Sequence, residues 1–238
     1  MTPEEQLARH TRRGFIALGA GAIVVAGGAY AIKPAPDDAD IPSPLRKVLG
    51  LNEKVVRSTI FSDRNFTRTY PNSAIKFLKK NGDFGIEEKI DLSAWRLQVG
   101  DKPLTMDDLL SLPKYDQTID FKCVEGWSVV TRFAGTRLSD FTARFAPGGA
   151  DSKFVGFQTP DKAYYVSIDQ PSANHPQTLL AYEMNGELLT QDHGAPLRLV
   201  IPVKYGIKNI KRIGSIEYTN DRPKDYWTEQ GYDWYAGL

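Results

Sequence analysis

The single cysteine of the chain lies among residues that could bind a metal. Cys123 is followed within four positions by Glu125, Gly126 and Trp127. A thiolate is a soft ligand that suits a soft or redox-active metal, and glycine allows the backbone to approach a bound group closely. A lone cysteine on an apolar strand is, however, more often a small core residue. The segment alone therefore leaves both interpretations open.

A second segment that could do chemistry begins at His193 and is rich in cations. Five cations fall within 15 residues: Arg198, Lys204, Lys208, Lys211 and Arg212. Arginine offers forked donors and lysine a point charge, and both suit a phosphate group. A solvated basic loop is the usual alternative, but Tyr205 and the apolar runs on either side fit it poorly. The segment is therefore a candidate anion site.

The residues before Cys123 alternate in polarity and predict a strand. Ile119, Phe121 and Cys123 alternate with Asp120 and Lys122, which is the period of two that strands show. Successive side chains of a strand point to opposite faces, so Cys123 faces the same side as the apolar residues. The thiol is therefore expected at the end of a strand, against a core.

The remaining pattern is rich in strands. A modified capping box at Thr105–Asp108 predicts a short helix, and helical spacing from Leu138 to Phe145 predicts a second. Strands are expected at 92–99, 154–159, 163–169, 179–184, 197–203 and 210–219. Asn185-Gly186 predicts a hairpin turn, whereas residues 41–90 show no clear periodicity and predict irregular structure with short helices. Strands outnumber helices without a regular β-α-β rhythm, so we predict an α+β, β-rich fold.

The N-terminal residues 1–32 differ from the rest and predict an export signal. Thr11-Arg12-Arg13-Gly14-Phe15 opens an uncharged run to Ile32 and resembles a twin-arginine signal. The run is also long enough to be a membrane anchor. Residues 33–44 hold prolines and acidic residues and are expected to be a linker before a folded domain at 45–238. The predicted location is periplasmic or extracytoplasmic, after export in the folded state.

Composition excludes several classes of protein. Hydrophobic residues make up 41% and charged residues 25%, as in ordinary soluble domains. The net charge of +1, without a long basic run, gives no indication of nucleic-acid binding. One cysteine excludes an internal disulfide and a c-type haem motif, and three scattered histidines argue against a zinc site.

Together the two segments resemble the molybdopterin domain of the sulfite-oxidase fold family, in particular its periplasmic methionine-sulfoxide reductase branch. That branch carries Cys-Val-Glu-Ala-Trp-Ser, and the present chain reads Cys123-Val124-Glu125-Gly126-Trp127-Ser128. It also carries Asn-Gly-Ala-Pro-Val-Arg and Pro-Trp-Lys-Tyr-Gly-Phe-Lys-Gly-Ile-Lys, matched here by His193–Arg198 and Pro202–Lys211. The likeness extends from about Leu92 to Pro223. Two motifs in the right order favour a functional cysteine over a core residue.

The resemblance implies a molybdenum cofactor carried by molybdopterin, and it implies roles for individual residues. Cys123 would supply the thiolate ligand of the metal. Glu125 or His193 would assist proton delivery, and a buried structural role is the alternative for each. Further cofactor contacts are implied at Asn65, Thr159, His193, Arg198, Asn209, Ile210 and Lys211. Among these, Arg198 and Lys211 would hold the pterin phosphate with help from the backbone at 209–210. The cofactor performs the redox chemistry, and the protein binds and orients it.

The implied activity is oxygen-atom transfer by an exported molybdopterin-dependent oxidoreductase. Sulfite oxidases follow the cysteine with an arginine that helps bind the anion, and the segment Glu125–Ser128 lacks it. A negative Glu125 would disfavour a sulfite dianion, so reduction of a small neutral S-oxide or N-oxide is expected. Because the chain has no haem motif, the resemblance implies a membrane haem-b subunit or a soluble cytochrome as electron partner. The C-terminal aromatic cluster is expected to pack on the domain as a structural tail, with a partner-docking surface as the alternative; it comprises Tyr226, Trp227, Tyr232, Trp234 and Tyr235.

Three alternatives stay open at the level of sequence. The same cofactor could catalyse sulfite-type oxidation, or the fold could be a non-catalytic binding module. A metal-free thiol enzyme could use Cys123 as its nucleophile. Cys123, Arg198 and Lys211 are all present, which argues against the binding module. No histidine stands in a recognisable dyad context, which argues against the thiol enzyme. Cofactor content distinguishes the first two alternatives from each other.

Overall fold

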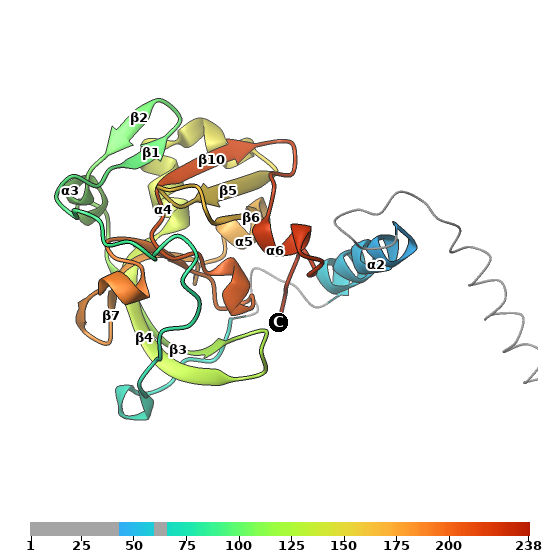
Figure 1. Cartoon of the computed structure of the whole chain (residues 1–238), viewed down its shortest axis with the longest axis horizontal. Helices are drawn as coiled ribbons and strands as arrows, with labels where there is room; N and C mark the ends of the chain where they lie inside the picture. The colour runs from blue at the N-terminus through green and yellow to red at the C-terminus, as the bar shows by residue number, and fades with distance from the viewer. Residues whose placement is uncertain (1–42, 60–65) are drawn as a thin grey trace, which may run out of the picture. The chain divides into compact units, whose positions relative to one another are not determined.

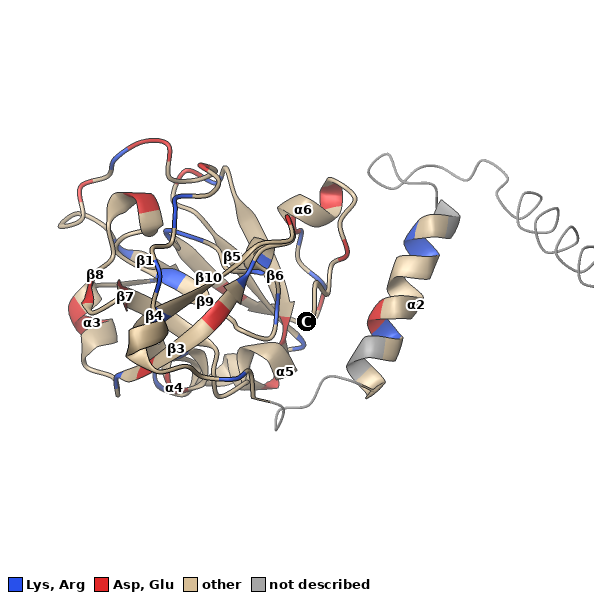
Figure 2. Cartoon of the chain, turned by 90° about the horizontal axis from the view of Figure 1, so that it is seen from below, with Lys and Arg blue, Asp and Glu red and all other residues tan. Residues whose placement is uncertain are grey.

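The computed structural model of the chain describes residues 43–59 and 66–238 (Figure 1). The expected signal or anchor at 1–32, the linker residues 33–42 and Asn65 lie outside the described residues. None of the helices in the described ranges is long and apolar enough to cross a membrane. In Figure 2, basic and acidic residues are interspersed along the ribbon.

The first described element is a long helix that the sequence analysis did not predict. Helix α2 (Ser43–Thr59) begins two residues before the expected domain start and is longer than the short helices expected within 41–90. A proline is tolerated in the first turn of a helix, so Pro44 does not prevent this start. The apolar residues recur at helical spacing, a signal that the mixed charges obscured: Leu45, Val48, Leu49 and Val55.

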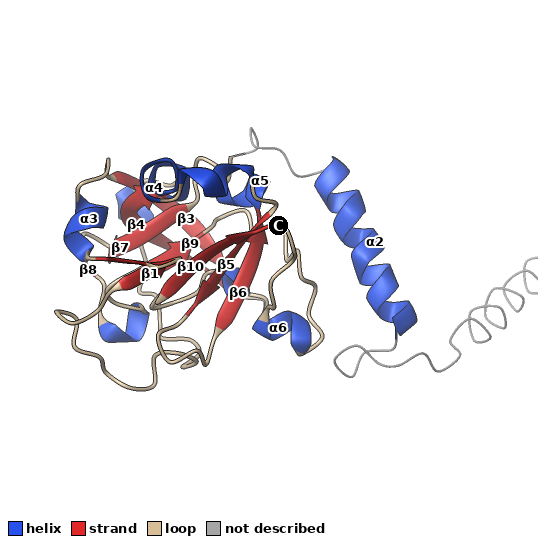
Figure 3. Cartoon of the chain, turned by 90° about the horizontal axis from the view of Figure 1, so that it is seen from above, coloured by secondary structure: helices blue, strands red, loops and turns tan. Residues whose placement is uncertain are grey.

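The rest of the described chain contains two five-stranded sheets (Figures 1 and 3). The first has the order β2-β1-β10-β5-β6, formed by Lys102–Leu104, Leu97–Val99, Ser215–Thr219, Phe154–Gln158 and Tyr165–Asp169. The second has the order β3-β4-β7-β8, with β9 paired to β7, formed by Tyr115–Lys122, Ser128–Arg137, Leu179–Met184, Glu187–Leu188 and Arg198–Val200. Strands β1 and β10 are parallel, and the other pairs are antiparallel.

Short helices connect the strands. They are α3 (Met106–Leu110), α4 (Leu138–Phe145), α5 (Gln170–Ala173) and α6 (Tyr226–Glu229), with 3-10 turns η1 (Asn72–Ala74), η2 (Pro147–Asp151), η3 (Gln191–His193) and η4 (Gly206–Lys208). Helices α4 and α5 lie along one side of the strands and α6 on the other (Figures 2 and 3). The capping box predicted at Thr105 is present, because its hydroxyl accepts from the Asp108 amide. The fold is α+β and β-rich, as predicted.

Three predicted strands are shorter than expected by four or five residues. The first begins only at Leu97, and the strand expected at 197–203 ends at Val200, two residues before Pro202. The last begins at Ser215, because the segment 210–214 runs through the core as a loop and buries Ile210 and Ile213 completely. Apolar content predicted burial there correctly but did not distinguish a strand from a buried loop.

Two apolar clusters support the site. The larger one packs against the first sheet and includes Leu97, Phe141, Phe157, Leu199 and Ile216. The smaller one packs on the second sheet and includes Ile119, Phe121, Phe133, Leu179 and Val200. Phe121 belongs to the smaller cluster and also lines the cavity described below, so Cys123 lies at the open end of this cluster.

Candidate active site

The cysteine lies in the turn between β3 and β4. Its amide donates to the Trp127 carbonyl at 2.9 Å, and the Gly126 amide donates to the Cys123 carbonyl at 3.1 Å. Gly126 has φ +87°, a conformation that glycine adopts readily and other residues rarely do. The thiol is 7% exposed and points into a cavity together with Phe121. The glycine therefore closes the turn that fixes the direction of the thiol.

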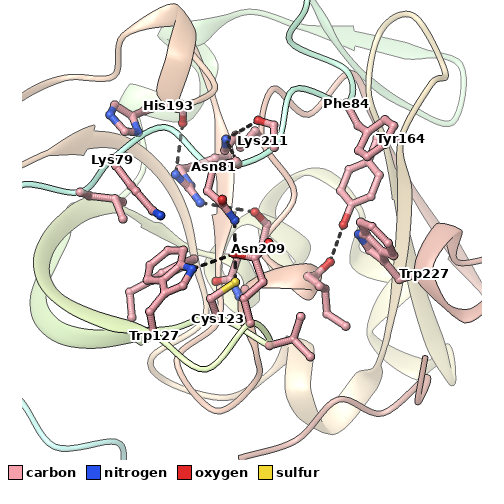
Figure 4. A pocket seen from close by; sticks show the side chains of 18 of the residues that line it. Lys79, Asn81, Phe84, Cys123, Trp127, Tyr164, His193, Asn209, Lys211 and Trp227 are labelled. Carbon is pink, nitrogen blue, oxygen red and sulfur yellow. Dashed lines mark hydrogen bonds between the residues drawn. The ribbon is translucent and has the colours of Figure 1, made fainter. Parts of the chain in front are cut away.

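A cavity of about 270 Å³ opens beside Cys123 (Figure 4). Its lining comes from distant parts of the chain: residues 78–84, 121–127, 164, 193–211 and 227–232. Six of the predicted site residues line it: Cys123, Glu125, His193, Arg198, Asn209 and Lys211. The fold therefore brings together the two segments that the sequence analysis singled out.

Arg198 is a buried cation without a counter-charge. Its side chain is 2% exposed, and no carboxylate of the described residues forms an ion pair with it. Its Nη atoms donate only to the His193 and Asn209 carbonyls, at 3.3 and 3.4 Å, and its Nε has no partner. Burial lowers the pKa of Arg198 to about 10. A buried guanidinium is costly unless it is paired, so its place on the cavity wall suits an anion.

Lys211 adds a second cation to the same wall. Its Nζ donates to the carbonyls of Asn81 and Gly82 at 2.6 and 3.0 Å. Burial, and secondly the charge of Arg198, lower the pKa of Lys211 to about 8. Among the described residues, no backbone acceptor is found for the Ile210 and Lys211 amides. The two cations that line the cavity, Arg198 and Lys211, are donors that fit a phosphate group.

His193 lies on the same wall but is not a third cation at neutral pH. It is buried, and desolvation followed by the charges of Arg198 and Lys211 lowers its pKa below the ordinary value. A neutral imidazole can both donate and accept a hydrogen bond. His193 therefore contributes a hydrogen-bonding group rather than charge.

Asn81 and Lys79 lie next to Cys123, and the sequence analysis missed both. The Asn81 amide nitrogen lies 3.8 Å from Cys123 Sγ, and the Lys79 ammonium lies 5.4 Å from the Trp127 ring centre. Desolvation raises the pKa of the thiol, and the charge of Glu125 adds to this rise. The amides of residues 124 and 125 and the charge of Lys79 oppose it. The region 66–90 lacks periodicity, so only its contacts with Lys211 and Cys123 locate these residues at the site.

A family assignment follows from comparison with known proteins. The family described as "Oxidoreductase molybdopterin binding domain" matches residues 84–227, which include both the cysteine turn and the cationic wall. The chain belongs to this molybdopterin-binding oxidoreductase family. It is therefore a molybdopterin-dependent oxidoreductase, and it is similar to methionine-sulfoxide reductase catalytic subunits, as its motifs predicted.

Two relatives and one solved structure illustrate the likeness. A candidate protein-methionine-sulfoxide reductase subunit, YedZ1, of Azospira oryzae is 36% identical over 84% of this chain and 79% of its own length. The protein-methionine-sulfoxide reductase catalytic subunit MsrP of Campylobacter jejuni is 30% identical over 100% of this chain and 83% of its own. The crystal structure of the sulfane dehydrogenase SoxCD from Paracoccus pantotrophus shares the fold, with a TM-score of 0.50 at 22% sequence identity. The match covers 57% of this chain and 40% of the SoxCD chain.

The cavity of this molybdopterin-dependent oxidoreductase fits the family's cofactor. No group of three His, Cys, Asp or Glu side chains in the described part of the chain could hold a metal ion. The Cys123 thiolate is a soft ligand that suits molybdenum held by a pterin dithiolene, and the phosphate of that pterin would complement Arg198, whose Nε atom has no partner.

The other three cations of the basic segment have structural roles. Lys208 is 1% exposed and pairs with Asp225 at 2.5 Å. The Lys204 ammonium donates to the Tyr235 carbonyl at 2.9 Å, and Arg212 donates to the Gln191 side chain at 2.6 Å. All three are buried, so the segment is not a solvated loop. Of the five cations, only Arg198 and Lys211 line the cavity.

Two predicted cofactor contacts do not line the cavity. The Thr159 hydroxyl donates to Asp161 at 2.5 Å and accepts from the Tyr164 amide at 3.1 Å. Its methyl group packs against Gly85, where a Cβ would lie 2.3 Å away. Thr159 thus supports the backbone next to the site. The side chain of Ile210 is fully buried in the core, so only its backbone is left for a ligand.

An aromatic wall lies across the cavity from the cations (Figure 4). It consists of Phe84, Tyr164, Trp227 and Tyr232. The C-terminal aromatic cluster was expected to be a structural tail, and Trp234 and Tyr235 are indeed buried. Trp227 and Tyr232 instead belong to the cavity. The spacing of aromatic residues predicted a cluster, but only the path of the chain shows which rings reach the site.

Proposed function

We propose that this protein is an exported reductase of S-oxides, with Cys123 as the protein ligand of its molybdenum. One observation carries the proposal: a thiol and a buried, unpaired guanidinium line the same cavity. The names of the relatives support S-oxide reduction as the direction of the reaction. An N-oxide is the second substrate class that the same chemistry would accept.

The residues divide into two groups by their place in the cavity. Arg198 and Lys211, with the Asn209–Ile210 backbone, would hold the phosphate of the pterin. Cys123 would hold the metal, and Asn81 would lie beside it in the role that the resemblance implied for Asn65. When bound, the cofactor supplies two-electron oxygen-atom transfer.

Glu125 contributes charge and proton transfer at the rim. Its carboxylate accepts a hydrogen bond from the Trp127 indole at 2.9 Å and is exposed. A negative group at this position disfavours a sulfite dianion and leaves a neutral S-oxide unaffected. Reduction of an S-oxide consumes two protons and releases water, and an exposed carboxyl can exchange protons with solvent. Glu125 would deliver them toward the cavity.

The electrons would come from a second protein. The name "catalytic subunit" of the relatives implies a partner subunit, and we propose a membrane haem-b subunit or a cytochrome. The twin-arginine pattern at Thr11–Phe15 supports export of the folded, loaded protein to the periplasm. Retention by residues 14–32 would keep the enzyme next to a membrane partner.

Metal and pterin analysis tests the proposal. The protein purified from its own compartment is compared with Cys123→Ala and with Ser128→Ala, a change at an exposed residue after the same turn. We expect about one molybdenum and one pterin per chain in wild type and Ser128→Ala, and loss or spectroscopic change in Cys123→Ala. The loaded enzyme should then reduce methionine sulfoxide with electrons from a reduced dye. Folded protein that contains neither molybdenum nor pterin would leave a binding module, and oxidation of sulfite without sulfoxide reduction would reverse the assignment.

A further inference from the structure

The cavity has two chemically distinct sides, and the proposed cofactor contacts account for one. Lys211 and His193 lie on the polar side, above Cys123 (Figure 4), and Arg198, which donates to the His193 carbonyl, lines the same cavity. Phe84, Tyr164 and Trp227 lie on the opposite side (Figure 4). An anionic group gains nothing from this aromatic side, so a second, apolar group should occupy it.

Two of the aromatic rings are exposed although both have packing partners. Phe84 is 42% and Tyr232 39% exposed, and both line the cavity. Exposed apolar groups that converge on a cavity mark a binding site more often than an accident of packing. An apolar ligand would remove from water the surface that these rings now expose.

The rings are fixed before any ligand arrives. The Tyr164 hydroxyl donates to the Ile207 carbonyl at 2.6 Å, so its polar end is satisfied and its ring is held. Trp227 contacts Tyr232 edge to face at 5.1 Å, and the Tyr232 amide donates to the Trp227 carbonyl at 2.9 Å. Phe84 contacts Trp227 at 6.1 Å. A ligand therefore meets a rigid wall and does not have to order it.

We propose that Phe84, Trp227 and Tyr232 form an apolar subsite that selects S-oxides by the substituents on sulfur. The inference rests on the proposed function. The oxygen of the S-oxide would face the Cys123 side of the cavity, and an alkyl or aryl substituent would lie against the rings. Sulfur and methyl groups make favourable contacts with aromatic edges and faces. The enzyme would therefore prefer S-oxides with larger apolar substituents to small polar ones.

Selectivity between two sulfoxides tests the subsite. The holoenzyme is assayed with methyl p-tolyl sulfoxide and dimethyl sulfoxide, and the ratio of the two kcat/KM values is compared among variants. We expect the ratio to fall about tenfold in Trp227→Ala and in Tyr232→Ala, as for other losses of apolar pocket contacts. Tyr232→Phe keeps the ring and should keep the ratio. Phe77→Ala is the matched control, because Phe77 is 85% exposed and lies outside the cavity lining.

Binding of the product gives a readout that does not depend on turnover. Calorimetry with methyl p-tolyl sulfide should show about tenfold weaker binding to the loaded Trp227→Ala variant than to wild type or Phe77→Ala. If wild type reduces neither sulfoxide but binds the sulfide through these rings, the proposed function fails and the subsite stands. If both alanine variants keep the wild-type ratio and sulfide affinity, the subsite is wrong. An equal loss for both sulfoxides, with a lower melting temperature, would make the rings structural and would also overturn it.

Discussion

Replacing Arg198 by methionine should change stability in opposite directions in the empty and the loaded protein. Burial lowers the pKa of Arg198 by more than two units from its ordinary value, to about 10. A tenfold change in proton affinity is worth about 1.4 kcal/mol, so the buried charge costs the folded apoprotein roughly 3 kcal/mol. Methionine keeps much of the apolar packing next to Phe121 and Phe133 and removes the charge. The two carbonyl hydrogen bonds that are lost are long, so their loss offsets only about 1 kcal/mol.

The apoprotein of Arg198→Met should therefore be more stable than wild-type apoprotein by about 2 kcal/mol, or roughly 5 °C in Tm. Urea unfolding of protein made in a host without the cofactor measures this. In a cofactor-competent host the same variant should retain little molybdenum or pterin, because the phosphate loses its buried partner. Arg198→Lys keeps the cation and should gain no stability. An Arg198→Met apoprotein less stable than wild type would refute the reasoning and would make the guanidinium a structural residue.

Three further predictions follow from the site and the fold. In the folded apoprotein, the pKa of Lys211 is lowered from 10.5 to about 8. Between pH 8 and pH 10.5, the Lys211 side chain is therefore protonated in the unfolded chain and deprotonated in the folded one. The free energy of unfolding should rise with pH across that window, and urea titrations of Lys211→Met should lack this part of the slope. Iodoacetamide should alkylate Cys123 in the apoprotein, and the rate should increase with pH because the pKa of this thiol is raised. In the loaded protein, alkylation should be about tenfold slower. Equal rates in the two forms, measured by mass spectrometry, would argue against the thiol as metal ligand. Gly135→Ala should destabilise the protein by about 2 kcal/mol or more, because a Cβ at this position would lie 2.1 Å from the Leu180 carbonyl oxygen. Gly148 has open space around it, so Gly148→Ala should change the free energy of unfolding by less than about 0.5 kcal/mol in the same urea assay.

Alternation and turn signals predicted most of the strands, because each depends on local burial. The strand before Cys123, the hairpin turn at Asn185 and the helix from Leu138 to Phe145 all occur as predicted. Structure that depends on long-range packing was harder to predict from the sequence. Ile210 and Ile213 are as apolar as strand residues, yet they lie in a buried loop. Apolar sequence predicts burial reliably and backbone geometry only when periodicity is also present.

The two halves of the site differ in the same way. Cys123, Arg198 and Lys211 could be predicted because their motifs are contiguous in sequence. The sequence of the five cations does not indicate which of them have a counter-charge. The counter-charges come from distant parts of the chain, as Asp225 does for Lys208. Asn81 had no motif or periodicity to mark it, and only the fold brings it to the thiol.

The C-terminal residues also determine when the site comes into existence during synthesis. Trp227 and Tyr232 emerge from the ribosome after every other cavity residue of the described chain. Until Asp225 arrives, the loop that carries Asn209 contains a lysine, Lys208, whose charge has no partner to be buried with. The nascent chain therefore presents neither a finished cavity nor a fixed phosphate wall. Cofactor insertion should be a post-translational event that acts on a complete domain and that a truncated or stalled chain does not undergo.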